Sequence, residues 1–179
     1  MTKKQQNLTS LVLCAIFAAL SVVLGRFFSY NVQDFSIGFG FLPVLICGML
    51  CGVWWGGICG ALADFVGAIL FPFGTYFPGF TAVAFLMGAV YGLIGLAERK
   101  TVRAWQFGIF AVMGVASTEL VGSLMLNSLW LSIMYGRPYA AEIVLRLPEA
   151  LFYFAVKLAF VLLIKQFVLP PLRKSFKRG

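Results

Sequence analysis

Histidine is absent from the 179 residues, and only six residues are acidic. Without histidine, neither a Ser-His-Asp triad nor an H-E-x-x-H zinc motif is possible. The phosphate-binding pattern G-x-x-x-x-G-K-[ST] is also missing, so ATP hydrolysis by that route is excluded. These absences leave little machinery for an enzyme.

Charged residues are missing from two long stretches, Ser36 to Ala63 and Phe65 to Ala97. Hydrophobic residues make up 61% of the chain and charged residues 11%. Because about 20 apolar residues cross the hydrocarbon core as a helix, the sequence predicts an all-α integral membrane protein. We expect one domain, residues 1–179, with six spans at about 8–28, 37–53, 57–71, 79–97, 104–135 and 148–168.

The basic residues are distributed unevenly. Lys and Arg number 14 and give a net charge of +8. Ten of the 14 lie before the first expected span, between the fourth and fifth, or near the chain's end. This is the positive-inside pattern, which predicts that both termini are cytoplasmic. The charge therefore reports topology and does not indicate a nucleic-acid partner.

The four cysteines, Cys14, Cys47, Cys51 and Cys59, all fall within expected spans. With no histidine and no clustered carboxylates, we expect no metal site and interpret them as small packing residues. Glycines recur every four residues from Gly48 to Gly60 and again at Gly88 and Gly92, which favours close helix contacts. A tight inner turn is expected within residues 52–57.

Proline, glycine and aromatic residues concentrate between the third and fourth spans. Proline and glycine break helices, and clustered aromatic rings are costly to leave in water. We therefore expect an aromatic lid over a small-molecule pocket in the outer half of the protein. Its breakers are Pro72, Gly74, Pro78 and Gly79, and its rings are Phe71, Phe73, Tyr76, Phe77 and Phe80.

The fifth span carries a polar stripe at helical spacing, formed by Glu119, Ser123, Asn127, Trp130 and Met134. Asn127 and Trp130 suit a heteroaromatic ligand, which an amide can hydrogen-bond and an indole can stack on. The alternative is an interhelical polar seam in which Glu119 pairs with Lys157. We favour the seam for Glu119 and Lys157, and the ligand for Asn127 and Trp130.

Other ionisable groups near the expected outer surface are further candidates, because charges inside a membrane bundle are expensive. Asp64 suits the adjacent N–H and amino groups of a ligand such as a pterin; its alternative is a partner for a buried donor. Arg26, Arg137 and Arg146 are candidates for binding ligand carboxylates. Arg26 falls near the Ala15/Ala19 stripe of an ideal helix, which disfavours it unless the helix bends.

Ala15 and Ala19 in the first span form a small-xxx-small pair. Small residues let helix backbones approach closely in lipid. The pair therefore marks either a contact with another helix of this chain or a docking face for a partner subunit.

Several motifs together resemble a known family, the substrate-binding S components of energy-coupling factor (ECF) vitamin transporters, and most closely their folate-specific branch. The resemblance covers nearly the whole chain. It is carried by A-x-x-x-A at 15–19, G-F-L-P-V-L-I-C-G-M-L-C-G at 40–52, A-D-F-V-G-A at 63–68, P-F-G-T-Y-F-P-G-F-T at 72–81 and N-S-L-W-L-S-I-M-Y-G at 127–136. The V-W-W-G-G after Gly52 departs from relatives that often have a proline near this turn.

The resemblance implies a six-helix folate-binding subunit in a prokaryotic plasma membrane, with no cofactor and no enzymatic activity of its own. Outer loops would close over the vitamin. Ala15 and Ala19 would dock on a transmembrane coupling subunit that is bound to two cytoplasmic ATPases. The implied ligand-binding residues are Arg26, Asp64, Tyr76, Phe77, Gly79, Phe80, Thr81, Asn127, Trp130 and Arg146. The alternatives are an S component for riboflavin or pantothenate, or a small integral-membrane enzyme.

Overall fold

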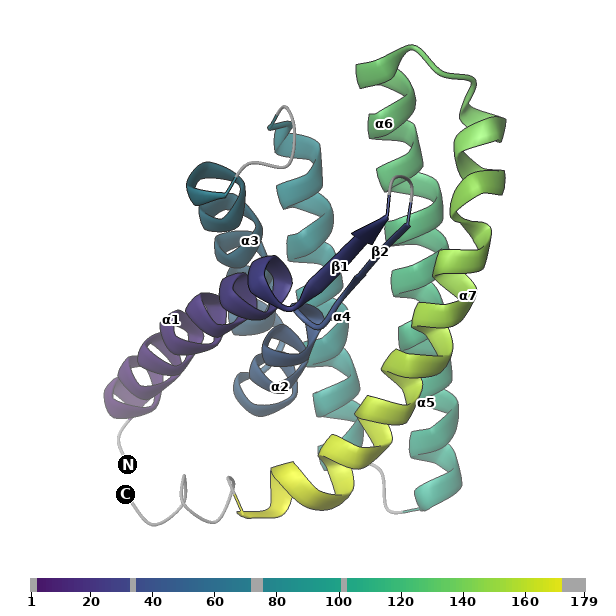
Figure 1. Cartoon of the computed structure of the whole chain (residues 1–179). Helices are drawn as coiled ribbons and strands as arrows, with labels where there is room; N and C mark the ends of the chain where they lie inside the picture. The colour runs from purple at the N-terminus through teal and green to yellow at the C-terminus, as the bar shows by residue number, and fades with distance from the viewer. Residues whose placement is uncertain (1–2, 33–34, 72–75, 101–102, 172–179) are drawn as a thin grey trace.

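The computed structural model describes residues 3–32, 35–71, 76–100 and 103–171, most of them in helices (Figure 1). In chain order the elements are α1 (Lys3–Phe27), β1 (Ser29–Val32), β2 (Phe35–Gly38), α2 (Phe41–Cys51), α3 (Val53–Leu70), α4 (Pro78–Lys100), α5 (Ala104–Ser117), η1 (Thr118–Asn127), α6 (Ser128–Tyr135), α7 (Tyr139–Leu163) and η2 (Ile164–Val168). The segments η1 and η2 are π-helical and continue the helices before them.

Among the described residues, five helical stretches are long and apolar enough to cross a membrane, against the six spans expected from the sequence. They are Lys4–Phe27, Val53–Leu70, Pro78–Lys100, Ala104–Tyr135 and Tyr139–Pro171. The helix α2 is also apolar but has only 11 residues. At 1.5 Å per residue it is roughly 16 Å long, about half the thickness of a hydrocarbon core.

The all-α prediction describes the helices of the protein, but the connection between α1 and α2 differs from it. A polar loop was expected at 29–36, but β1 and β2 pair there as an antiparallel hairpin, with Ser29 opposite Gly38 and Val32 opposite Phe35. The second span, expected at 37–53, is correspondingly shortened to α2. The apolar run that suggested one helix is divided between a strand and a helix.

The inner turn between α2 and α3 is tighter than expected. Gly52 alone makes it, with φ of 100°, and α3 begins at the next residue and not at Gly57. That backbone angle is readily available only to glycine. The outer connection expected at 136–147 is also short, since α7 begins at Tyr139 and carries Pro148 inside the helix.

The pair α3 and α4 packs through glycines, in agreement with the four-residue spacing. A methyl group added at Gly88 would strike the backbone of Gly56. At Gly48 it would lie 2.9 Å from the backbone nitrogen of Gly92. The three helices α2, α3 and α4 are therefore held at backbone contact distance.

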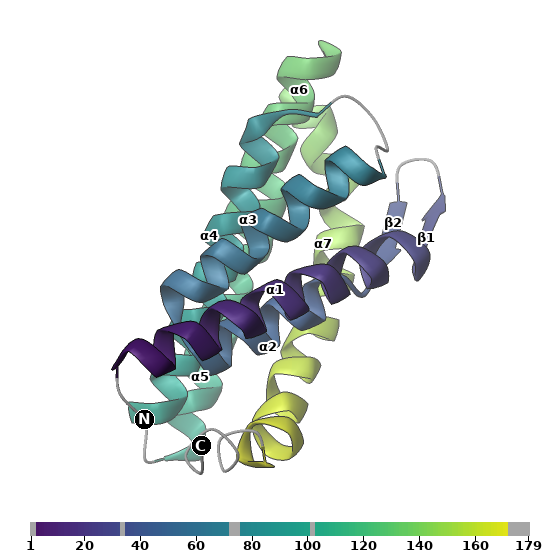
Figure 2. The same cartoon turned by 90° about the vertical axis from the view of Figure 1, so that its left-hand side faces the viewer.

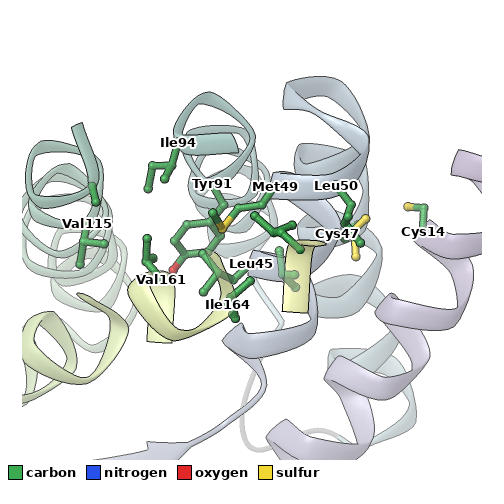
Figure 3. Packing of buried hydrophobic residues seen from close by; sticks show 14 of the residues in the cluster. Cys14, Leu45, Cys47, Met49, Leu50, Tyr91, Ile94, Val115, Val161 and Ile164 are labelled. Carbon is green, nitrogen blue, oxygen red and sulfur yellow. The ribbon is translucent and has the colours of Figure 1, made fainter. Parts of the chain in front are cut away.

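The buried core lies where α2 and α4 pack against α5 and α7 (Figure 3). Leu45, Met49, Tyr91 and Val161 are each no more than 2% exposed. Many large apolar side chains face outward instead, including Trp54, Ile69 and Met113. An apolar surface around the helices is what a lipid environment requires.

In the view of Figure 2 the helix α1 lies in front of α2 and runs alongside it. It covers the bundle with Cys14, Ala18 and Val22, which are all buried. The side chains of Cys14, Cys47 and Cys59 are buried together, with their sulfur atoms within 4.8 Å of one another. The thiols of Cys14 and Cys47 donate to the carbonyl oxygen of Trp55, at 3.7 and 3.9 Å, and so connect three helices.

Candidate functional site

A cavity of about 270 Å³ opens among α1, α2, α3, α4 and α7. Three charged residues contribute to its wall: Arg26 from α1, Asp64 from α3 and Lys157 from α7. The remaining lining residues are Ser21, Val22, Gly25, Gly40, Phe41, Val44, Gly60, Ala63, Ala84, Met87 and Tyr91. Small residues are frequent in the α1 and α3 walls, namely Ser21, Gly25, Gly60 and Ala63.

The first turn of α4 joins this cavity to the aromatic cluster predicted from the sequence. The hydroxyl of Thr81 donates to Asp64 Oδ2 at 2.7 Å. The Tyr76 hydroxyl lies 3.0 Å from Thr81 Oγ1, and it is the donor there because the Thr81 proton is already used. Asp64 thus fixes both Thr81 and Tyr76, yet a carboxylate can accept further hydrogen bonds.

Gly79 lies two residues before Thr81, beneath the rings of Phe77 and Trp130. Those rings are 5.2 Å apart between centroids, at an interplanar angle of 43°. A methyl group added at Gly79 would lie 2.6 Å from Phe77 and 2.7 Å from Trp130. Only glycine lets both rings approach α4 this closely. Phe80 completes the cluster with an edge contact to Phe77 at 6.3 Å.

Asn127 and Trp130 supply unsatisfied polar atoms beside these rings. Asn127 Oδ1 and Trp130 Nε1 are buried and have no hydrogen-bond partner among the described residues. Buried polar atoms are nearly always paired with protein, water or a ligand. An acceptor and a donor of this kind next to aromatic rings can bind the edge of a flat heterocycle.

The predicted polar stripe faces the interior along its whole length. Glu119 is buried, and Ser123, Asn127, Trp130 and Met134 are partly buried, whereas Leu120, Val121, Met125 and Ile133 are exposed. The stripe passes through the π-helical segment η1, which the sequence did not indicate.

The interhelical alternative is confirmed for Glu119 and Lys157. Lys157 Nζ lies 2.5 Å from Glu119 Oε1, and the two side chains are only 9% and 3% exposed. The ammonium group also lies over the rings of Phe41 and Tyr153, at 5.3 and 5.2 Å from their centroids. The pair links the stripe to α7 and to the start of α2.

A family model described as ECF transporter, substrate-specific component, matches residues 9–169. The chain belongs to this family. The family expected from the sequence motifs is therefore confirmed, and it is a transporter component and not a class of enzyme.

Individual proteins similar to this ECF component include the folate transporter FolT of Clostridium novyi (strain NT). That relative is 32% identical over 146 residues, which are 82% of this chain and 81% of that protein. The folate transporter FolT of Leuconostoc mesenteroides subsp. mesenteroides is 29% identical over 124 residues, which are 69% and 64% of the two chains.

Two solved structures are similar to the whole fold. A crystal structure of FolT bound with folic acid has a TM-score of 0.75 and 35% sequence identity, covering 88% of this chain and 92% of that chain. ThiT from Listeria monocytogenes has a TM-score of 0.67 at 19% identity, covering 90% and 96%. The second likeness concerns the fold alone.

The three arginines that were predicted to bind ligand carboxylates have different surroundings in the structure. Arg26 lines the cavity and packs against Gly67, where an added methyl group would lie 3.3 Å from Arg26 Nε. Its long side chain reaches inward although Ala15 and Ala19 on the same helix are exposed. Arg146 instead lies 3.9 Å from Glu149 on its own helix, and Arg137 lies 3.4 Å from Glu142.

Part of the expected lid, residues 72–75, lies outside the described residues. Two tyrosines in the described part were missed. Tyr91 lines the cavity from α4, and Tyr153 binds the hairpin backbone at Gly38. A usable signal existed for Tyr153, because it lies four residues before Lys157 and so shares its face of α7.

Proposed function

We propose that this ECF substrate-specific component binds folate between the cavity and the aromatic cluster. The proposal is supported by the two FolT relatives and by the 35% identity to a FolT that was crystallised with folic acid. The observation that carries it is the pair of buried atoms without a hydrogen-bond partner among the described residues, Asn127 Oδ1 and Trp130 Nε1, together with the contact of the Trp130 and Phe77 rings.

Folate has a flat pterin ring and an anionic glutamate tail, and the site offers a partner for each. The ring stacks on Phe77 and Trp130, while Asn127 and Asp64 bind its polar edge. The tail binds Arg26, which lines the cavity. Arg146 stays a prediction that its contact with Glu149 does not favour.

The size of the cavity sets one condition on this proposal. About 270 Å³ is just below the range of roughly 300–1,000 Å³ found for ligand pockets. Folate therefore needs the Phe77 and Trp130 rings to part and add their space to the cavity.

The proposed topology has six crossings, with α2 and the hairpin together forming the second. The first turn of α1 and the end of η2 lie at the same end of the molecule (Figure 1). The start of α1, the end of α4 and the start of α5 carry four basic residues at or next to that end: Lys4, Arg99, Lys100 and Arg103. This distribution supports a cytoplasmic side in a prokaryotic plasma membrane.

For transport we propose that a transmembrane coupling subunit docks on the Ala15/Ala19 face and that two ATPases supply the energy. Both alanines are exposed in this chain, while Cys14 and Ala18 on the neighbouring face make the contacts within the bundle. An exposed small-residue face is open to a second helix at backbone distance.

The test is a panel of thermal unfolding curves for the purified protein in detergent, with folate, riboflavin, pantothenate and thiamin. A ligand that binds the folded state raises the midpoint in proportion to the logarithm of its concentration over its dissociation constant. We expect folate alone to do so. A rise with another vitamin and none with folate would contradict the substrate assignment.

A further inference from the structure

Tyr153 on α7 binds the β-hairpin through the backbone of a single residue. The N–H of Gly38 donates to the Tyr153 hydroxyl at 2.6 Å, and the hydroxyl donates to the Gly38 carbonyl oxygen at 3.2 Å. Gly38 pairs with Ser29, so both strands are held at their base. In Figure 1 the hairpin extends from α1 toward α6 and α7.

The base of the hairpin is continuous with the cavity wall. Gly25 and Arg26 line the cavity just before β1, and Gly40 and Phe41 line it just after β2. The stretch between them is therefore attached at both ends to residues of the cavity wall. On the α1 side, Ser21 Oγ donates to the Gly40 carbonyl oxygen at 2.6 Å and holds one of them.

The Tyr153 ring is itself fixed by its surroundings. Phe41 meets it edge-on, at 6.0 Å between centroids and an angle of 88°. Lys157 lies over its face at 5.2 Å and is held by Glu119. A ring restrained on two sides directs its hydroxyl at Gly38 without further loss of side-chain freedom.

We propose that Tyr153 is a positioning residue that holds the hairpin against α7 and thereby sets how often the cavity opens toward the hairpin side. It does not line the cavity. It acts on a ligand through the hairpin, and through Lys157 it connects the hairpin to the helix that carries Asn127 and Trp130. Only the consequence for folate release rests on the proposed function.

The first test is hydrogen–deuterium exchange of the ligand-free protein, comparing Tyr153→Phe with the parent. This substitution keeps the ring and its contacts with Phe41 and Lys157 and removes only the hydroxyl. We expect the amides of β1 and β2 to exchange about five- to tenfold faster, because the substitution removes both hydrogen bonds to Gly38, with α7 unchanged. Tyr135→Phe, at an exposed tyrosine, is the matched control.

The second test is the dissociation rate of folate from the same variants. Tyr153→Phe should release folate about five- to tenfold faster at an unchanged melting temperature, and Tyr135→Phe should match the parent. Unchanged hairpin exchange would overturn the proposal. So would faster exchange spread over α7 with a lower melting temperature, because that is a general structural role. If the parent fails to bind folate, the proposed function fails while the exchange test still decides the role of Tyr153.

Discussion

Asn127 and Trp130 each present a buried polar atom with no partner among the described residues. Such an atom is stable only when water or a ligand satisfies it. If folate is that ligand, removing either side chain costs about 1–3 kcal/mol of folate-binding free energy, because a polar group of the ligand is then left without a hydrogen-bond partner.

We therefore expect Asn127→Ala to weaken folate binding about tenfold or more, measured by titration calorimetry in detergent. Leu129→Ala, on the exposed side of the same helix, should bind as the parent does. Equal affinity of Asn127→Ala and the parent would remove Asn127 from the site. Trp130→Ala should lose affinity as well, because both the indole N–H and the stacking surface disappear.

Gly79 offers a steric test of the aromatic cluster. In Gly79→Ala the new methyl group must displace Phe77 and Trp130, so we expect folate affinity to fall about tenfold while the protein still folds. Gly108→Ala is the control, because no atom lies within 4 Å of a methyl group added there. An unaffected Gly79→Ala would show that the two rings are not part of the binding surface.

Among the elements, η1 and α7 are joined most strongly by the Glu119–Lys157 ion pair. A buried pair contributes little compared with a well-packed apolar pair, but removing one partner leaves an uncompensated charge. The structure therefore predicts a strong asymmetry between single and double substitutions at this contact.

Lys157→Met should destabilise the protein by about 3–5 kcal/mol and lower its unfolding temperature clearly. Glu119→Gln/Lys157→Met together should recover most of that loss, since neither retained group is charged. Thermal unfolding of the two single variants and the double variant in detergent measures the coupling. If the losses simply add, the two groups do not interact in the membrane-embedded protein.

Helices were predictable from the sequence where one residue spacing, or a uniformly apolar composition, extends over a whole segment. The charge-free run from Phe65 to Ala97 predicted the bounds of α4 to within a few residues. The four-residue glycine spacing predicted that α4 packs closely against α3. The hairpin was missed because residues 29–36 were interpreted as a polar loop and Ile37 and Gly38 as the start of a helix, although F-S-I-G-F at 35–39 alternates as a strand does. The start of α7 was missed because Pro148 was taken as a helix start, whereas α7 accommodates it internally.

The candidate site was predictable where a residue is out of place in a membrane. Asp64 and Asn127 stand out because polar groups are rare there. Tyr153 does not, since tyrosine is common in such helices and its role depends on Gly38, 115 residues away in sequence. The π-helical turn in η1 has no sequence signal that we recognise.

At the scale of the whole molecule, the exposed Ala15/Ala19 face predicts a separation of binding from transport. Ala15→Leu/Ala19→Leu keeps the helix apolar and fills the face, so we expect folate affinity to be unchanged. Uptake by cells that contain the coupling subunit and the ATPases should fall at least tenfold. Leu20→Ala, at a neighbouring exposed position, is the control. Normal uptake by the double variant would place the docking face elsewhere.

The shortness of α2 has a consequence for the membrane around it. The outer edges of β1 and β2 carry backbone groups that hydrocarbon cannot satisfy, so the hairpin has to sit at a level that water reaches. The helix α2 is only roughly 16 Å long, and in Figure 1 the strands β1 and β2 lie below the upper ends of α6 and α7. We therefore expect water to reach deeper into the protein on the hairpin side than beside α6 and α7, toward Arg26, which lies just before β1 and lines the cavity.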